Sequence, residues 1–420
     1  MAETAAATDP QTSPAGSCLA ETGILLILAF ANGALALDRL AVNFLSPYIV
    51  AELSLSNAQL GLLSSAMSFT ISGSGLLLSA VADRTGKRRQ ILIAALVLFS
   101  LFSASAGLAT GFVMLVAARL ALGAAEGPVL PLTQAFMAVN SHPGRRGFNM
   151  GAMQIGGAFL IGAVIGPVLA VAIAEPYGWR TAFFASAIPG LLSALLITLF
   201  VRNRVAVPEK SDLETAPAPR QVAIGASLAE LMRNRNVMIS AFIAGIFTAW
   251  LTVQNVFMPV TMIRENGFTT TEMGTVLGVA GFGGLAGGII VPALSDRFGR
   301  KPMVVLSGLI CVLAPVAMLT ITGSPILLAI AMALGWLTVG CAPLVIAVIP
   351  GESASEGSFT TAVAVSLLSA ELIGGVLTPP LAGLAADAWG LQAPFLIAIL
   401  LALIVAAAGL LLEETAPRAR

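Results

Sequence analysis

Twelve long apolar segments run through this chain of 420 residues, and they constrain its fold more than any other feature. A helix that crosses a bilayer needs roughly 20 mainly apolar residues. Soluble domains carry about 25% charged residues, whereas this chain carries 10% and is 57% hydrophobic. We therefore expect an all-α membrane protein with twelve transmembrane helices. The predicted spans are 22–50, 57–82, 90–110, 112–140, 147–174, 179–201, 236–262, 272–295, 302–321, 325–349, 358–386 and 391–412.

One long polar stretch divides the spans into two sets of six. It contains RNRVAVPEKSDLETAPAPR and reads as a cytoplasmic linker between two six-helix bundles. The predicted organisation is a disordered N-terminal tail at 1–21, a bundle at 22–201, the linker at 202–235, a second bundle at 236–412 and a C-terminal tail at 413–420.

The two halves repeat each other in sequence. ADRTGKRR after the second span matches SDRFGRKP after the eighth, which places Asp83 opposite Asp296. A six-plus-six repeat is typical of transporters whose halves move around a site near the bilayer midplane. Two further matches keep the same register to within one position: GPVLA (166–170) with TPPLA (378–382), and GWRTAFF (178–184) with GLQAPFL (390–396).

Basic residues predict the orientation. If both termini are cytoplasmic, 17 of the 21 Lys and Arg residues fall in cytoplasmic segments. The positive-inside rule favours this arrangement, so we expect a multi-pass protein of the cell (inner) membrane. The segment between spans ten and eleven departs from the rule, because it carries Glu352 and Glu356 and no base.

Several classes of function lack support in the composition. The net charge is zero, which gives no reason to expect a nucleic-acid partner. With three cysteines and the single histidine His142, a Cys/His metal site has too few ligands, and we expect no metal and no cofactor. The chain contains no GxxxxGK[ST] phosphate loop and no nucleophile–base pair, so no motif suggests an enzyme. A monomer is expected, since rocking of two halves needs no partner.

Three motifs resemble one family. ADRTGKRR and SDRFGRKP resemble the loop motif G-x-x-x-D-R-x-G-R-R of the major facilitator superfamily, with Ser79 and Pro292 in place of the leading glycines. LDRLAVNFLSPYI (37–49) with LSNAQLGLLSSA (55–66), and RLALGAAEGPVLP (119–131), are similar to spans one, two and four of its anion:cation symporters and Spinster-like transporters. The resemblance implies two pseudo-symmetric six-helix bundles and secondary transport by alternating access.

Four charges lie well inside predicted spans: Asp38, Arg39, Arg119 and Glu126. Each costs about 2.5–3.5 kcal/mol at bilayer depth, so they must face the protein interior and find partners. Arg119 and Glu126, at i and i+7, share a helix face. We expect Asp38 to pair with Arg119, and Arg39 with Glu126, across spans one and four.

These charges suggest a coupling device. An anionic substrate needs an arginine that a carboxylate already holds, and protonation of Asp38 or Glu126 frees that arginine. A buried carboxylate whose proton affinity depends on its surroundings suits this task. In the resembled symporters, the matching acids carry protons and the matching Arg39 and Arg119 engage the substrate or hold these acids. The alternative is a salt-bridge network that only locks the helices together.

Glu371 is the one membrane-embedded acid of the second half. It precedes Gly374 and Gly375 by about one turn. It is either a second proton-coupling or substrate site, or a cap for a kink made by Thr378-Pro379-Pro380.

Amides and aromatic residues mark further candidates for substrate binding. Trp250 and Gln254, at i and i+4, share a face of span seven, with Asn255 at the margin of this face. Amides bind carboxylates and hydroxyls, while aromatic faces hold carbon skeletons. Asn43 in span one and Gln154 in span five are weaker candidates. The alternative for all five is helix packing.

The loop motif and its copy are expected to form a gate. Asp83 can accept hydrogen bonds from the N-terminus of a facing helix such as span eleven. Arg84 and Arg88, with Lys87, would meet acids across the seam, with Glu352 and Glu356 as candidates. Asp296 and Arg297 are the copies of Asp83 and Arg84. The alternative is that these residues only determine topology.

The sequence therefore favours proton-coupled symport of a small organic anion, either a sugar acid or an aromatic or other carboxylic acid. Its partners would be that anion, protons and the lipid bilayer. The alternative is export of amphipathic lipid-like or drug-like compounds. A receptor built on a transporter scaffold would need a signalling domain, and the linker leaves no room for one.

Overall fold

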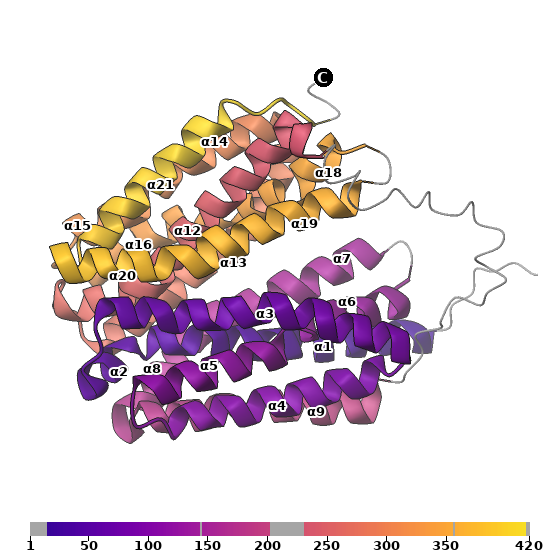
Figure 1. The fold of residues 1–420 in the computed structure, drawn as a ribbon, viewed down its shortest axis with the longest axis horizontal. Helices are drawn as coiled ribbons and strands as arrows, with labels where there is room; N and C mark the ends of the chain where they lie inside the picture. The colour runs from indigo at the N-terminus through magenta and orange to yellow at the C-terminus, as the bar shows by residue number, and fades with distance from the viewer. Residues whose placement is uncertain (1–14, 143–144, 202–230, 356–357, 417–420) are drawn as a thin grey trace, which may run out of the picture.

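The computed structural model describes residues 15–142, 145–201, 231–355 and 358–416. Every regular element in these ranges is helical. The helices form two groups that lie side by side, α1 to α9 and α12 to α21 (Figure 1).

The first group holds α1 (Ala15–Phe44), α2 (Ser46–Leu53), α3 (Asn57–Thr85), α4 (Arg88–Gly107), α5 (Phe112–Glu126), α6 (Val129–Asn140), α7 (Arg146–Gly151), η2 (Ala152–Gly156), η3 (Ala158–Ile165), α8 (Gly166–Tyr177) and α9 (Trp179–Phe200). The second group holds α12 (Arg235–Arg264), α13 (Thr270–Phe298), α14 (Arg300–Cys311), α15 (Leu313–Thr320), α16 (Pro325–Trp336), η4 (Leu337–Gly340), α17 (Cys341–Pro343), η5 (Leu344–Val348), α18 (Ile349–Ser353), α19 (Phe359–Ser369), η6 (Ala370–Leu377), α20 (Thr378–Trp389) and α21 (Ala393–Gly409).

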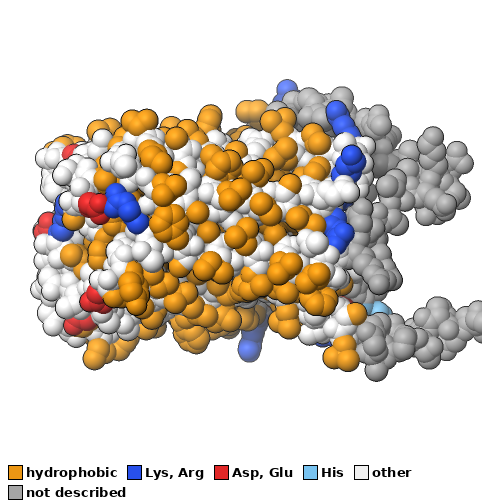
Figure 2. Space-filling model, turned by 90° about the horizontal axis from the view of Figure 1, so that it is seen from below, with side chains coloured by type: hydrophobic (Ala, Val, Ile, Leu, Met, Phe, Trp, Pro, Cys, Tyr) orange, Lys and Arg blue, Asp and Glu red, His pale blue; other side chains and the backbone are white. Residues whose placement is uncertain are grey.

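These elements join into membrane-spanning units. Eleven helical stretches of the described chain are long and apolar enough to cross a membrane, and the shorter apolar helix α21 adds a twelfth. Figure 2 shows apolar side chains over the middle of one face, with Lys and Arg side chains gathered at one edge. The predicted all-α membrane fold is confirmed.

Parts of both predicted tails have a defined structure. α1 starts at Ala15, so residues 15–21 are helical rather than part of a disordered tail. The Glu21 carboxylate anchors this end, because it accepts hydrogen bonds from the Asn149 amide and from the backbone N–H of His142. The predicted span 22–50 is also broken after Phe44, and α2 restarts with a proline in its first turn.

Part of the predicted C-terminal tail packs against α14. The Glu414 carboxylate accepts the backbone N–H groups of Arg300 at 2.8 Å and Lys301 at 3.2 Å. Burial opposes the charge of Glu414, but hydrogen bonds from four backbone N–H groups outweigh it and lower the pKa of this carboxyl below its usual value. The start of α14 therefore holds the chain end through charge-assisted hydrogen bonds.

The sequence repeat is also a repeat of backbone geometry. The π-helical segments η3 and η6 begin at Ala158 and Ala370, which are equivalent positions of the repeat, and have the same length. The α-helices that follow them end at Gly178 and Gly390, with φ of 83° and 87°, where glycine avoids the steric cost of a side chain. Spans five and eleven thus share their bends and their ends.

The two groups of helices close against each other at one end, which we call the far end. It holds α2 and the start of α3, away from the described chain termini (Figure 1). The two oxygens of Asp387, in α20, accept the backbone N–H groups of Asn57 at 2.9 Å and Ala58 at 3.0 Å. On the other side of the seam, the Thr271 hydroxyl donates to Glu175 at 3.2 Å. Asp387 and Glu175 are again equivalent positions of the repeat.

Backbones of the two groups also approach each other closely at this end. A Cβ added to Gly383 would lie 2.3 Å from the carbonyl oxygen of Asn57, and one added to Gly61 would lie 2.2 Å from that of Pro379. Among the described residues, every hydrogen bond between the two groups lies at the far end. The ribbons diverge toward the opposite end, which we call the terminal end (Figure 1).

Candidate functional site

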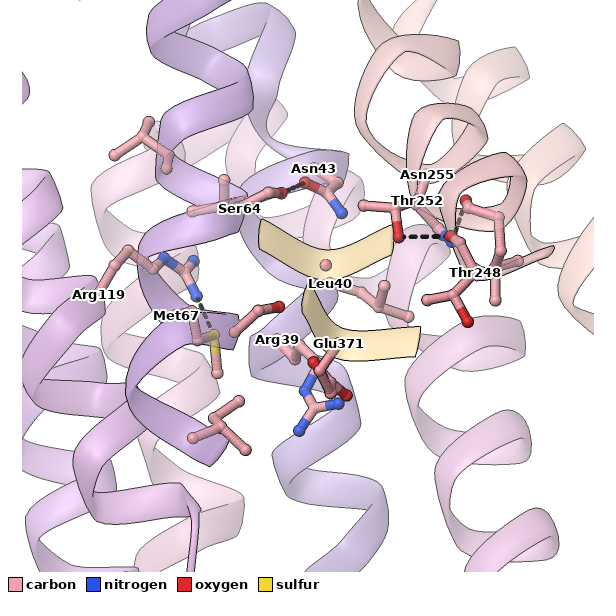
Figure 3. A pocket seen from close by; sticks show the side chains of 16 residues that line it. Arg39, Leu40, Asn43, Ser64, Met67, Arg119, Thr248, Thr252, Asn255 and Glu371 are labelled. Atoms are coloured by element: carbon pink, nitrogen blue, oxygen red, sulfur yellow. Dashed lines mark hydrogen bonds between the residues drawn. The ribbon is translucent and has the colours of Figure 1, made fainter. Parts of the chain in front are cut away.

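A cavity of about 230 Å³ lies between the two groups of helices, about midway along α3 and α12. We call it the central cavity (Figure 3). α1, α3 and α5 line one side, and α12 and η6 line the other. Its polar and charged lining residues are Arg39, Asn43, Ser64, Ser68, Arg119, Thr248, Thr252, Asn255 and Glu371. Polar residues at this depth are unfavourable unless they serve an internal site.

Arg39 and Glu126 form an ion pair between α1 and α5. Both Nε and Nη2 of Arg39 donate to Glu126 Oε1, the former at 3.1 Å. The Arg39 side chain is 48% exposed and that of Glu126 only 4%. The guanidinium therefore lies at a cavity surface, and the carboxylate lies behind it.

Arg119 and Asp38 form a second pair that is almost fully buried. Arg119 Nη1 lies 3.7 Å from Asp38 Oδ2 and 3.4 Å from the Asp38 carbonyl oxygen. The Asp38 Oδ1 atom accepts hydrogen bonds from the hydroxyls of Ser103 and Ser186. The Arg119 guanidinium also lies over the ring of Phe183 at 5.5 Å. The structure thus contains both predicted pairings.

The two arginines of these pairs line the central cavity, and their partner acids do not. Arg39 and Arg119 line it, whereas Asp38 and Glu126 are absent from its lining. Two nitrogens of Arg119, Nε and Nη2, are buried without a hydrogen-bond partner among the described residues. A buried unpaired donor costs about 1–3 kcal/mol, so an anion placed beside Arg119 would gain unusually strong contacts.

A second cavity of about 260 Å³ begins on the other side of Arg39. Arg39 and Glu126 line it together with Asn32 and Gln154. Gln154 is predicted as a substrate ligand, and the structure places it here rather than in the central cavity. Asn32, Gln154 and Glu126 lie nearer the terminal ends of their spans than Arg39 does, so we call this the terminal-side cavity. Arg39 separates the two cavities.

The face of α12 that lines the central cavity differs from the predicted one. Trp250 is fully buried and donates from Nε1 to the Cys311 carbonyl oxygen at 3.2 Å. Gln254 is also fully buried, one turn further on the same face, and neither residue lines the cavity. The structure therefore places these two predicted ligands outside the central cavity, on a face that packs against neighbouring helices. Asn255 does line the cavity, as predicted.

Sequence reasoning missed the hydroxyl groups of the cavity. Thr248, Thr252 and Asn255 follow one another at steps of four and then three positions on α12, which is the spacing of one helix face. Ser64 and Ser68 follow the same rule on α3. The Ser64 hydroxyl donates to Asn43 Oδ1 at 3.2 Å (Figure 3). A search for polar residues at helical spacing would have found both faces.

Glu371 reaches the central cavity from η6, in the second group of helices. It points toward Arg39 (Figure 3), and the two charges interact electrostatically. The bend that follows in span eleven is satisfied by another residue, since the Thr378 hydroxyl donates to the Ile373 carbonyl oxygen at 2.6 Å. Of the two predicted roles, the cap of this bend therefore falls to Thr378.

The predicted gate residues make local contacts in this conformation. Arg88 Nε, at the start of α4, pairs with Asp83 Oδ1, at the end of α3, at 2.7 Å. Arg84 is exposed. The predicted partner of Asp83 at the start of span eleven is not within hydrogen-bonding distance of it among the described residues.

The copy of the motif behaves in the same way. Arg300 pairs with Asp296 at 2.5 Å and with Glu352 at 3.1 Å, so Glu352 is engaged within its own half. The Arg297 guanidinium lies over the ring of Phe298 at 5.5 Å. Glu356 lies outside the described residues. The expected contacts across the seam would need the terminal end to close.

The described ranges offer no metal site. No group of three or more His, Cys, Asp or Glu side chains within residues 15–142, 145–201, 231–355 and 358–416 is placed to hold a metal ion. Cys311 and Cys341 are buried free thiols.

Proteins of similar sequence transport organic acids. The chain is 28% identical over 284 residues to a hexuronate transporter of Bacillus subtilis (strain 168), and the match covers 66% of each chain. It is 26% identical over 312 residues to a 4-hydroxybenzoate transporter of Pseudomonas aeruginosa, and that match covers 67% of each chain. The chain thus spans about two thirds of the length of the curated relatives that it matches.

Solved structures share the fold. A bacterial homolog to the human lysosomal transporter Spinster, in an inward-facing and unoccupied conformation, superposes with a TM-score of 0.75 at 20% identity, covering 93% of this chain and 96% of that one. A mutant of the nucleoside transporter NupG superposes with a TM-score of 0.77 at 15% identity, covering 93% of this chain and 99% of that one. The sequence profile of the Major Facilitator Superfamily matches residues 28–257 and 237–420. The chain therefore belongs to the Major Facilitator Superfamily and is a multi-pass membrane transporter rather than an enzyme.

Proposed function

We propose that this transporter carries a small organic anion together with protons by alternating access. The observation that carries the proposal is Arg119, which is one of the residues that line the central cavity and has two buried nitrogens without a partner among the described residues. A carboxylate accepts such donors in a charge-assisted, geometrically matched contact. The relatives that transport hexuronate and 4-hydroxybenzoate support the same class of substrate.

The lining favours a hydroxylated aliphatic acid, such as a sugar acid, over an aromatic acid. The sixteen residues that line the central cavity include no Phe, Trp, Tyr or His. They do include four hydroxyl groups and two amides, which suit the hydroxyls of a substrate. A volume of about 230 Å³ and this polarity also argue against a long acyl chain.

The coupling step centres on Arg39. Its guanidinium is held by Glu126 at the boundary of both cavities. A proton on Glu126 removes the charge that holds Arg39, and Arg39 then pairs with the substrate carboxylate. Asp38 acts differently in this proposal, because two serine hydroxyls and Arg119 fix its carboxylate. It orients Arg119 and makes no contact with the substrate.

The two halves contribute opposite walls of the cavity, so a bound anion would contact both. Arg39 and Arg119 come from one half, and Thr252 and Asn255 from the other. Contacts that form only when the halves approach favour closure around the substrate. We assign the terminal end to the cytoplasm on the distribution of Lys and Arg.

Proton movement in proteoliposomes tests this proposal. Purified protein is reconstituted with an internal pH dye and challenged with hexuronates, aldonates, hydroxybenzoates and a lysolipid. We expect a hydroxylated acid to move protons inward in the wild-type protein and not in Glu126→Gln. Loss of one partner of a buried charge pair costs about 2–5 kcal/mol, so Arg119→Gln should lower apparent affinity at least roughly 30-fold.

Arg264→Gln is the matched control, because Arg264 is an exposed arginine at the end of α12. It should leave transport unchanged. If no acid moves protons and the lysolipid is carried, the symport proposal is wrong and export of amphipathic compounds replaces it.

A further inference from the structure

The charges around the central cavity do not balance. Asp38, Arg39, Arg119 and Glu126 form two ion pairs of zero net charge. Glu371 adds a third carboxylate, and no hydrogen bond or ion pair joins it to another residue that the structure describes. The described cluster of five groups therefore carries two positive and three negative charges when all are ionised.

The charged neighbours of Glu371 come from the other half of the protein. Arg39 of α1 lines the same cavity and interacts electrostatically with both Glu126 and Glu371. α5 supplies Glu126 and Arg119. Arg119 lines the same wall of the cavity as Arg39. The remaining neighbours that line this part of the cavity are uncharged: Ser68 of α3, and Thr248 of α12. Arg39 is therefore shared between two acids.

A monovalent anion cannot enter this cluster with one proton and leave it neutral. The ionised cluster has a net charge of −1, so one proton brings it to zero, and the anion then returns it to −1. An uncompensated charge near the bilayer midplane is costly. Two protons bring the cluster to +1, and the anion then makes the loaded site neutral.

We propose that Glu371 is the second proton carrier of this transporter, so that each monovalent anion crosses with two protons and one net positive charge. This inference rests on the proposed function. In the loaded state the protons form O–H bonds on Glu126 and Glu371, and Arg39, released by both, pairs with the substrate carboxylate. On the opposite side the anion and both protons leave, and the ionised carboxylates hold Arg39 again.

Membrane potential distinguishes two protons from one. With two protons per monovalent anion, one positive charge moves inward in each cycle. One charge moved through 100 mV corresponds to about 2.3 kcal/mol, and each 1.4 kcal/mol is about a factor of ten. An interior-negative potential of about 100 mV, imposed with a potassium gradient and valinomycin at equal pH, should therefore raise steady-state accumulation of the anion about 50-fold.

The variant Glu371→Gln should abolish this voltage effect. With one proton per anion the cycle moves no net charge, so the same potential should leave accumulation unchanged. Exchange of labelled for unlabelled anion requires no net proton movement, and it should survive in Glu371→Gln, which shows that the variant folds and binds. Glu265→Gln is the matched control, because Glu265 is an exposed acid at the end of α12, and it should retain the full voltage effect.

The outcomes separate this inference from the proposed function. If no organic acid moves with protons, the proposed function is wrong. If an acid is accumulated with protons but the wild-type protein does not respond to potential, Glu371 keeps one charge state through the cycle and the inference alone is overturned. A Glu371→Gln variant that still shows the wild-type accumulation under potential would assign the second proton to another group.

Discussion

Single side chains decide which face of α12 meets the substrate. The side chains of Trp250 and Gln254 are buried among neighbouring helices. Those of Thr248, Thr252 and Asn255 line the central cavity. The two sets lie on one helix and have similar polarity, so composition does not separate them. What separates them is the neighbouring helix: Trp250 reaches the Cys311 carbonyl oxygen of α14.

Gln254 and Asn255 provide a matched pair of amides. Both amide atoms of Gln254 are buried without a partner among the described residues, and such groups cost about 1–3 kcal/mol. We expect Gln254→Leu to raise thermal stability in detergent and to leave transport intact. Asn255→Leu should weaken substrate affinity with little change in stability. The opposite pattern, with transport lost in Gln254→Leu, would return Gln254 to the substrate site.

Glu414, which lies outside the membrane-spanning segments, predicts a pH dependence of the protein's stability. Its pKa is lowered in the folded protein, where backbone N–H donors outweigh the effect of burial. Its stabilising contribution is therefore present above about pH 4.5, the ordinary value, and is lost as pH falls through the folded pKa. Glu414→Gln should lower the melting temperature at neutral pH and match the wild type in strong acid. Glu413→Gln, a change in the neighbouring exposed acid, should show no such convergence.

At the scale of elements, the ends of spans five and eleven hold the far end closed. Asp387 accepts two backbone N–H groups at the start of α3, and Glu175 accepts the Thr271 hydroxyl at the start of α13. The N-terminus of a helix attracts negative charge through its unpaired N–H groups. The sequence repeat places one carboxylate on each side of the seam, where Asp387 accepts backbone N–H groups and Glu175 accepts a side-chain hydroxyl.

Removal of one carboxylate should open the far end. Loss of an N-terminal cap costs about 0.5–2 kcal/mol, so Asp387→Asn should raise the population of far-end-open molecules about fivefold. Spin labels would replace Ala51 and Trp389, which are exposed positions on opposite halves. Pulsed electron paramagnetic resonance should then show longer distances between the labels in Asp387→Asn than in the otherwise unchanged protein. Glu272→Gln is the control, because Glu272 caps its own helix at Thr269 and not the other half. Equal distance distributions in both variants would rule out this role for Asp387.

At the scale of the whole molecule, the structure has one closed end and one end where the halves diverge (Figure 1). We propose, from the distribution of Lys and Arg, that the diverging end faces the cytoplasm. The gate predicted at Asp83, Arg88 and Asp296 lies at that end, and its residues are paired locally. Their exchange of partners across the seam remains a prediction for the state in which that end closes.

Orientation is testable in cells. A protease-cleavable tag after Arg420 should be protected in intact cells and cleaved in inverted membrane vesicles. The control is the same tag in the predicted external loop after Arg264, which should show the reverse pattern. Cleavage of the C-terminal tag in intact cells would mean that the positive-inside rule fails for this chain and that the proposed direction of opening is reversed.

The amino-acid sequence alone determined the class of the protein. Apolar segments of sufficient length fix the number of spans through the bilayer thickness, and charges inside spans must pair, which identified Asp38, Arg39, Arg119 and Glu126. The register of the repeat located Gly178 and Gly390 as equivalent ends of spans.

Only the tertiary structure decided which polar residues meet in the central cavity. In a chain that is apolar on nearly every helix face, periodicity does not distinguish a face that packs from one that lines a cavity. For this reason the sequence alone did not place Trp250 and Gln254 on a packed face, or Ser64 and Thr252 in the cavity. The position of Glu371 opposite Arg39 depends on how the two halves dock, and this electrostatic interaction joins residues from different halves of the chain.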